Sequence, residues 1–430
     1  MLSTNAAVIT CEPPNIPLAR TEQPIGLRCV LITTPFELLN LKEEWQSLTL
    51  NIPDISSCAL PDWTIAWWHA FGAKASGAGL ETRLYVLTFR NSRDELIAVA
   101  PFYEDQPHSL LRIRRLRPIG YLGRERAFDM TEEPTLAIRP GFEGEVVEAV
   151  VDQIQGELES GRWDFVALIL GPEIGPSSRN LLAQILRQAS FARSEPRTGS
   201  DYTSLPGTWQ EYRLQLTKSM RENISYYPRL LTREGKDWFL RTIDEPHEMS
   251  AAVECLSVLH QGRSASTRGK RHSNHLHGES QIVFLTEFMR RTAGTNGSFI
   301  TELVVNGEVV ASQAFFITGE TLTVSYSGFD EAFYRYSPIF IINSAVFKDA
   351  QKRGIQRLNF LRNMAPWKAR WLAKEGPSFQ RTFAVRRNAI SMARYGLHTI
   401  CIIVERDLLL RLPVLLKRLR NTFFAKLSLR

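Results

Sequence analysis

The strongest constraint on the fold is a pair of strands that is predicted twice along the chain. The segments Arg83–Arg90 and Glu95–Tyr103 are rich in apolar side chains, and a polar turn lies between them. Residues Phe299–Val305 and Val309–Ile317 do the same around Asn306-Gly307, a dipeptide typical of tight hairpin turns. The sequence therefore predicts one hairpin in each half of the chain.

A helix and a short apolar strand follow each hairpin, so the repeat is longer than the hairpin itself. The later strands contain Asp164-Phe165 and Asn359-Phe360. The two halves are offset by about 212 residues at the hairpins and about 195 at the later strands, which is one period with loops of different length. The chain is predicted to hold two copies of one α/β unit, residues 27–205 and 206–385.

The ends of the chain differ in composition from the two units. Residues 1–26 are rich in Pro and small polar side chains and are expected to be a flexible lead-in. Residues 386–430 contain ten Lys or Arg residues and two Asp or Glu residues. The whole chain contains 52 Lys or Arg and 45 Asp or Glu residues, so the rest of the chain is nearly neutral. The charge of +7 therefore belongs to the tail, and the nearly neutral body argues against a nucleic-acid partner.

The tail carries apolar side chains at helical spacing with basic residues between them. Over residues 408–430 this pattern favours a basic amphipathic helix that contacts an anionic membrane surface. A terminal helix that packs on the body would show the same amphipathicity, and Pro413 interrupts the run. Both interpretations stay open at this point.

Cysteine usage and hydropathy bound the compartment. The five cysteines are scattered, without the spacing of a zinc knuckle or a redox pair, which favours a reducing compartment. No basic region followed by an apolar run opens the chain, and no apolar stretch reaches the roughly 20 residues of a membrane span. A cytoplasmic protein is expected, at most peripheral to the inner face of a membrane.

A series of short motifs follows in a fixed order through the second unit. They are Leu205–Tyr212, Leu259–Arg263, Glu302–Ala311, Ser325–Asp330, Tyr334–Pro338, Leu358–Arg362 and Trp367-Lys368. Together with the tryptophans between Trp45 and Trp68 and the segment Ala98–Phe102, this series resembles the CelD-like (BioF2-like) acyltransferases of the GNAT superfamily, which are related to FemAB-type aminoacyl transferases. The resemblance spans about Leu27 to Val385.

The resemblance implies two tandem GNAT folds with a mixed sheet in each, and an acyl-CoA-dependent N-acyltransferase. Acetyl-CoA or another acyl-CoA is the implied cofactor, and the acceptor is an amine, such as an amino sugar or a precursor of envelope or exopolysaccharide synthesis. The first unit has no counterpart of the Tyr-Ser-Pro helix entry. We therefore expect it to be catalytically silent and to form one wall of a cleft between the units.

Five residues are candidates for holding the cofactor. Ser337, Ile339 and Phe340 open a predicted helix, whose free N–H groups and dipole can receive a pyrophosphate. Alternatively, these residues form an ordinary helix N-terminus with Ser337 as its N-cap and have no role in binding. The other two candidates are Gln313 in a predicted strand and Lys368 after the late strand. Alternatively, Gln313 is a polar residue on the outer face of its strand, and Lys368 is a solvated lysine in a loop.

Four residues are candidates for catalysis, and His260 and Arg263 are also candidates for substrate contact. His260 and Arg263 lie three positions apart and would share one face of a helix end, where a neutral imidazole could take a proton from the amine. Tyr326 and Tyr336 could protonate the leaving thiolate. The alternatives are a helix-terminal histidine and half-buried tyrosines that serve packing.

Asn359 and Arg362 are expected to contact the acceptor substrate. The chain departs from the family pattern at two positions: Ile339 stands where the family usually has Gly, and Asn359 where it favours an acidic residue. Because Ile339 has a side chain where glycine has none, a phosphate cannot come as close to the backbone at this position. The second removes a carboxylate that could act as a base.

No metal site is expected. His272, His275 and His277 lie together in a polar, basic loop with no Cys or Asp beside them, which suits a flexible segment or a loop over the substrate better than zinc. A nucleophile elbow and a Walker loop are missing from the sequence as well.

Two rival functions remain for such a chain. One is a FemAB-like aminoacyl transferase that uses charged tRNA, which the near-neutral body disfavours. The other is a catalytically degenerate, membrane-docked scaffold in polysaccharide assembly, which Ile339 and Asn359 favour.

Overall fold

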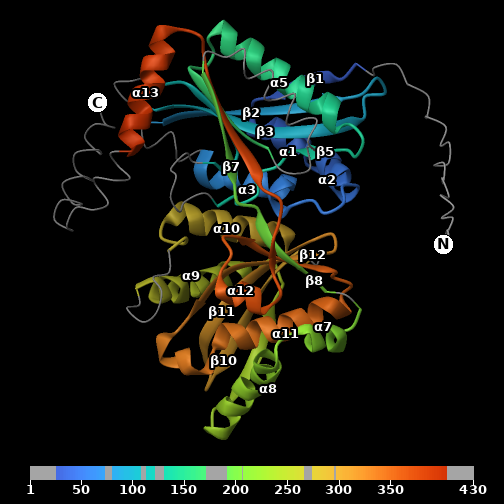
Figure 1. Cartoon of the computed structure of the whole chain (residues 1–430), viewed down its shortest axis with the longest axis vertical. Coiled ribbons are helices and arrows are strands. Elements are labelled where there is room, and N and C mark those ends of the chain that lie inside the picture. The colour runs from blue at the N-terminus through green and yellow to red at the C-terminus, as the bar shows by residue number, and fades with distance from the viewer. Residues whose placement is uncertain are drawn as a thin grey trace, which may run out of the picture.

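A computed structural model of the chain describes residues 26–72, 80–107, 113–121, 130–170, 191–205, 207–265, 274–294 and 297–403. Two mixed β-sheets lie one above the other along the long axis, each with helices against it (Figure 1). Residues 1–25 of the predicted lead-in 1–26, His272 and the amphipathic segment 408–430 lie outside the described residues. The α/β prediction is confirmed.

The first sheet has the strand order β1-β2-β3-β4-β6-β15-β7, with β5 paired to β3. Its strands are β1 (Arg28–Ile32), β2 (Leu80–Arg90), β3 (Leu96–Pro107), β4 (Arg115–Pro118), β5 (Ala137–Ile138), β6 (Phe165–Leu170), β7 (Phe191–Arg197) and β15 (Phe379–Val385).

The second sheet has the order β14-β8-β13-β12-β11-β10-β9. Its strands are β8 (Ser200–Ser204), β9 (Trp238–Ile243), β10 (Ser298–Val305), β11 (Glu308–Thr318), β12 (Thr321–Phe329), β13 (Arg357–Arg362) and β14 (Lys374–Glu375).

Helices and short helical turns connect the strands. In the first half they are α1 (Pro35–Asn40), α2 (Lys42–Leu50), η1 (Ser57–Ala59), α3 (Pro61–Trp67), η2 (Trp68–Gly72) and α5 (Glu143–Ser160). In the second half they are α7 (Trp209–Gln215), α8 (Lys218–Arg233), α9 (Met249–Ala265), α10 (Glu279–Thr292), η4 (Glu331–Tyr336), α11 (Pro338–Lys352), α12 (Pro366–Arg370) and α13 (Ala389–Ile403).

The internal repeat is visible in the pairing of the strands. In the first sheet β2 and β3 form an antiparallel hairpin, β4 is antiparallel to β3, and β6 is parallel to β4. In the second sheet β10, β11, β12 and β13 repeat that series in the same senses. Two tandem units with one topology are the result.

Two strands cross the predicted boundary between residues 205 and 206. Strand β8, which precedes the boundary, pairs with β13 and β14 in the second sheet. Strand β15, which belongs to the second half of the chain, pairs with β6 and β7 in the first sheet. Each sheet thus extends past its parallel strand with a segment from the other half, so the two sheets do not separate at residue 205.

The predicted tail begins as part of the body. Helix α13 follows β15 and is tied to the first sheet by Asp164, which accepts from Ser391 Oγ at 2.8 Å and from Arg394 at 3.1 Å. Residues 389–403 are therefore a docked helix rather than part of a free tail. Membrane contact through residues 408–430 stays a prediction.

One hydrophobic cluster contains side chains of both units. Helix α3 of the first half packs against α10 of the second, and the ring of Trp63 makes edge contacts with Phe284 and Phe288 at 4.8 Å each. The Trp63 indole N–H donates to Thr131 Oγ1 at 2.7 Å. Because apolar side chains of both halves belong to this cluster, the relative placement of the two sheets is fixed by burial.

Candidate functional site

The second sheet opens between its two central parallel strands. Strands β12 and β13 are paired only from Thr321 to Thr323, opposite Arg357 to Asn359. Beyond Asn359 the register of β13 shifts, and Leu361 and Asn363 adopt left-handed φ values of 60° and 70°. The strands separate here because the bulge turns β13 away from its neighbour.

A pocket of about 710 Å³ lies at this opening. It is lined by the end of β12, the first turn of α11, the bulge of β13, α12, two turns of α8, the end of α9 and the loop of the first unit around Glu132. The predicted site residues that line it are His260, Arg263, Gln313, Tyr326, Ser337, Ile339, Phe340, Arg362 and Lys368. Tyr336 and Asn359 do not line it.

The first turn of α11 forms one end of the pocket. Ser337 has φ 47°, and its side chain makes no cap hydrogen bond, so the expected serine cap does not form. Pro338 occupies the first turn, where its missing N–H costs nothing. The ring of Phe340 stacks on Trp371 at 5.1 Å and meets Tyr227 edge-on at 5.6 Å. The pocket therefore has an aromatic wall beside a positive helix end.

His260 is held at both ring nitrogens. Its Nε2 accepts from the backbone N–H of His275 at 3.1 Å, so the proton sits on Nδ1, which donates to the carbonyl of Ser327 at 2.8 Å. Helix α9 comes this close to β12 because Gly328 has no side chain: a Cβ there would lie 2.3 Å from the backbone nitrogen of His260. This arrangement uses the imidazole to fasten the loop at His275 and leaves no nitrogen for an amine.

Arg263 and Tyr326 line the pocket with polar groups. The Arg263 guanidinium donates to Ser327 Oγ at 2.9 Å and lies 5.1 Å from the ring centre of Phe329. Burial lowers the pKa of Arg263, although an arginine keeps its charge in proteins. The Tyr326 hydroxyl donates to Met130 Sδ at 3.6 Å, and burial raises its pKa, so it remains a protonated donor.

Tyr336 is placed away from the pocket. Its hydroxyl donates to Glu234, which also pairs with Arg335. The hydrogen bond to Glu234 raises the pKa of Tyr336. The predicted role of Tyr336 at the leaving group therefore does not fit its position.

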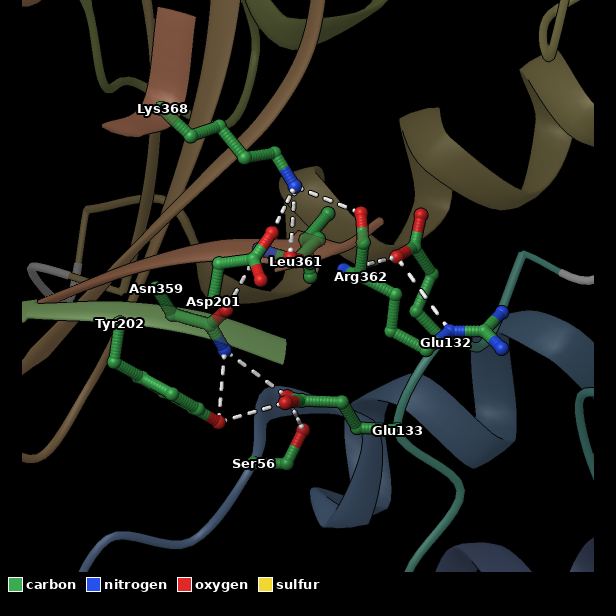
Figure 2. Close-up of polar contacts among 9 residues, drawn as sticks. All are labelled: Ser56, Glu132, Glu133, Asp201, Tyr202, Asn359, Leu361, Arg362 and Lys368. Atoms are coloured by element: carbon green, nitrogen blue, oxygen red, sulfur yellow. Dashed lines mark hydrogen bonds and ion pairs between the residues drawn. The ribbon is translucent and has the colours of Figure 1, made fainter. Parts of the chain in front are cut away.

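Lys368 braces the bulge of β13. Its ammonium group donates to Asp201 Oδ2 at 2.8 Å and to the carbonyls of Leu361 and Arg362 at 2.9 and 2.7 Å (Figure 2). Burial lowers the pKa of Lys368, while the hydrogen bond and charge of Asp201 raise it. With all three protons donated within the protein, Lys368 shapes the pocket wall and is neither a solvated lysine nor a free phosphate ligand.

Asn359 belongs to a buried contact between the two halves. Its amide nitrogen donates to Glu133 Oε2 at 3.0 Å, and Glu133 also accepts from Tyr202 at 2.7 Å and from Ser56 at 3.0 Å (Figure 2). The carbonyl oxygen of Asn359 accepts from the N–H of Leu361 at 2.8 Å. An acidic side chain at position 359 would face the Glu133 carboxylate, so this chain needs an amide here.

Glu132 is the pocket residue that sequence reasoning missed. Its Oε2 accepts from the backbone N–H of Arg362 at 2.9 Å and lies 3.8 Å from the Arg362 Nε. In the part of the chain that the structure describes, it is the one carboxylate that lines the pocket. No local pattern marks Glu132, because the strand that it meets is 230 positions away in sequence.

Among the described residues, four buried polar atoms of the pocket have no hydrogen-bond partner: Arg362 Nε and three side-chain oxygens. The oxygens are Gln313 Oε1, Ser325 Oγ and Asn343 Oδ1, and the side chains of Gln313 and Asn343 are each only 2% exposed. Buried polar groups of folded proteins are almost always paired, so these oxygens point to a ligand that donates hydrogen bonds.

Neither a metal cluster nor a membrane span is found in the described ranges. No group of three His, Cys, Asp or Glu side chains there is arranged to hold a metal ion. Burial, followed by the charge of His275, lowers the pKa of His277. No described helix is both long and apolar enough to span a bilayer.

Comparison with known proteins locates a family within the second unit. Residues 218–369 match the acetyltransferase (GNAT) domain family, and this range contains most of the pocket. No curated protein sequence matches the chain.

Solved structures that resemble the fold include FemX, at 9% identity and a TM-score of 0.52, over 79% of this chain and 95% of that one. A tandem GNAT protein from the clavulanic acid biosynthesis pathway is 9% identical with a TM-score of 0.45, and the match covers 84% of this chain and 98% of that one. The C-terminal domain of a putative lysylphosphatidylglycerol synthetase from Agrobacterium fabrum is 11% identical with a TM-score of 0.46, and the match covers 86% of this chain and 97% of that one.

Proposed function

We propose that this chain, an N-acyltransferase of the GNAT superfamily through its residues 218–369, moves the acyl group of acetyl-CoA or another acyl-CoA to a small-molecule amine. The observation that carries the proposal is the position of the pocket. It opens where β12 and β13 separate, and it reaches from the N-terminus of α11 to a carboxylate of the other unit. An acyl donor and an amine could meet there from opposite ends.

The end at α11 suits the phosphates of a CoA molecule. Ser337 and Phe340 lie at the positive end of a helix of 15 residues, and the guanidinium groups of Arg335 and Arg370 line the same pocket. Ile339 lines the pocket and packs against the hydrophobic cluster beneath α11, which leaves less room than a glycine would. The bound group would supply a thioester, whose carbonyl carbon is open to attack by an amine.

The interior of the pocket suits the polar part of the acyl donor. The carbonyl oxygens of Gln313 and Asn343 and the hydroxyl of Ser325 would accept or exchange hydrogen bonds with amide or hydroxyl groups. Orienting the two reactants in this pocket would contribute several kcal/mol to lowering the barrier.

The end at Glu132 would receive the acceptor. Tyr326, Arg362 and Glu132 supply a hydroxyl, a guanidinium and a carboxylate there, which suits an amine that also carries hydroxyl or anionic groups, such as an amino sugar. We place this reaction in the cytoplasm, with residues 408–430 as a possible contact to the membrane.

A second candidate function is aminoacyl transfer. The unpartnered carbonyl oxygens of Gln313 and Asn343 favour it, because the ammonium group of an aminoacyl moiety is a strong donor. A charged tRNA as donor would require a basic surface for its backbone, which can be tested as salt-dependent RNA binding.

The deciding experiment is calorimetric titration of the full chain with acetyl-CoA and with CoA. We expect both to bind, and we expect Arg370→Ala to weaken both. The control is Arg353→Ala, which removes a similar charge near the other end of α11, where Arg353 pairs with Asp349. No heat of binding at millimolar concentrations of either compound would overturn the proposed function and favour the scaffold.

A further inference from the structure

We infer that Glu132, a residue of the unit expected to be silent, is the general base that takes the proton of the acceptor amine in the pocket of the other unit. This inference rests on the proposed function and assigns a catalytic residue to it. The first unit would then complete the active site rather than only enclose it.

The position of Glu132 carries the inference. Its side chain is 29% exposed and lines the pocket, with Oε2 hydrogen-bonded to the backbone N–H of Arg362 at 2.9 Å. The other oxygen, Oε1, accepts from no donor among the described residues. The carboxylate is thus anchored at one oxygen and open at the other, within reach of molecules in the pocket (Figure 2).

Three other titratable groups at the site are poor candidates for the base. His260 receives the N–H of His275 at its one unprotonated nitrogen, and Lys368 holds its protons on Asp201 and on the bulge. Tyr326 is kept protonated by burial. Glu132 is the one carboxylate among the described residues that line the pocket, so it can both attract a cationic acceptor and accept a proton from it.

The neighbouring glutamate fixes the loop that presents Glu132. Glu133 is 4% exposed and accepts hydrogen bonds from Ser56, Tyr202 and Asn359. One of these donors lies in the first half of the chain, one on β8 and one on β13. Two adjacent carboxylates thus have separate tasks: Glu133 joins the halves of the chain, and Glu132 faces the reactants.

The proposed step balances as follows for an amine and an acyl thioester. As the new N–C bond forms and the C–S bond breaks, the nitrogen gives one proton to Glu132. The sulfur keeps the electron pair of the C–S bond and takes one proton from solvent. The proton on Glu132 then returns to solvent, so the products are an amide and a thiol.

The test compares Glu132→Gln with Glu133→Gln in the full chain. Glucosamine and methylammonium serve as acceptor probes with acetyl-CoA, and hydrolysis of acetyl-CoA gives a rate that needs no particular amine. We expect Glu132→Gln to lower kcat by about 10²–10⁴-fold, the usual contribution of a general base, with the Kd of CoA unchanged. Glu132→Asp should recover part of the loss.

The pH profile separates a base from a structural residue. In the wild type, kcat should fall toward acidic pH, and Glu132→Gln should lack that acidic limb. Glu133→Gln should keep the limb and lower the midpoint of thermal unfolding instead. A kcat for Glu132→Gln within twofold of wild type, or an unchanged acidic limb, would refute the inference while leaving the acyltransferase intact.

Failure of the proposed function would look different. A wild-type chain that binds no CoA, or that binds acetyl-CoA and turns over neither the amines nor water, would leave Glu132 no reaction to assist and would overturn both proposals. A chain that acetylates a probe amine supports the function, and the variants then decide on Glu132.

Discussion

The two units contain equivalent pairs of parallel strands, but the cavities at the ends of these strands differ greatly in size. In the second unit, the junction of β12 and β13 opens into a pocket of about 710 Å³. In the first unit, a cavity next to the ends of β4 and β6 measures only about 10 Å³, the lower limit of what a water molecule needs. Among the described residues, the same topology therefore borders a large pocket in one copy and a very small cavity in the other.

The first junction carries buried charged side chains that pair with one another. Asp105 binds Arg115 at 2.6 Å and Arg117 at 3.3 Å, and His398 of α13 lies 3.5 Å from Arg115. Pro101 lines the small cavity at the position that the hairpin offset aligns with Gln313. The charged groups named here are thus paired among themselves in the first unit, whereas Gln313 Oε1 and Asn343 Oδ1 of the second have no hydrogen-bond partner among the described residues.

The largest effect should come from breaking the buried ion pair of the second junction. Lys368→Met leaves Asp201, which is fully buried, without its cation and removes the donors that hold Leu361 and Arg362. We expect a loss of about 3–5 kcal/mol in the free energy of unfolding, measured by urea denaturation, together with weaker CoA binding.

The matched change in the first junction is Asp105→Leu. It leaves Arg115 and Arg117 buried without a carboxylate and should cost a similar free energy, about 3–5 kcal/mol, while CoA binding persists. Loss of CoA binding in folded Asp105→Leu protein would mean that the two junctions are not independent.

A smaller effect is expected from filling the contact between α9 and β12. Gly328→Ala places a Cβ 2.3 Å from the backbone nitrogen of His260, so the helix and the strand must move apart. We expect a destabilisation of about 1–3 kcal/mol in chemical denaturation, with reduced activity because His260 and Arg263 line the pocket. The control is Gly262→Ala in α9, because a Cβ at Gly262 would meet open space.

The first junction should also respond to acid. Burial, with the charges of Arg115 and Arg117, lowers the pKa of His398 from 6.5 to about 3, so the folded chain keeps it neutral while the unfolded chain protonates it. Its contribution to stability is therefore lost as the pH falls from about 6.5 toward 3, by at most about 1.4 kcal/mol per pH unit. Urea denaturation from pH 7 to 5 should show a smaller slope in His398→Leu; an equal slope contradicts the assignment.

The smallest effect concerns the choice of acyl donor. Gln313→Leu replaces an unpartnered amide by an apolar group and should shift the ratio of kcat/KM for butyryl-CoA over hydroxybutyryl-CoA upward, by about tenfold. Asn343→Leu should act in the same direction. An unchanged ratio in both variants would remove these residues from the acyl-binding part of the pocket.

Much of the fold follows from local patterns. Alternation and the Asn306-Gly307 turn mark β10 and β11, and Pro338 with the apolar positions after it marks α11, because hairpins and helix starts are set by neighbours in sequence. The same local signals put Ser337, Ile339 and Phe340 in the pocket, since they lie on an element whose start the sequence defines.

The sequence by itself determined that there are two α/β units, where their hairpins lie, and which turn of α11 lines the pocket. Only the tertiary structure decided that β8 and β15 cross between the sheets, that Asn359 meets Glu133, and that Glu132 enters the pocket. These contacts join residues more than 150 positions apart. They arise from packing two halves on one core, and no spacing within a short stretch of sequence records them.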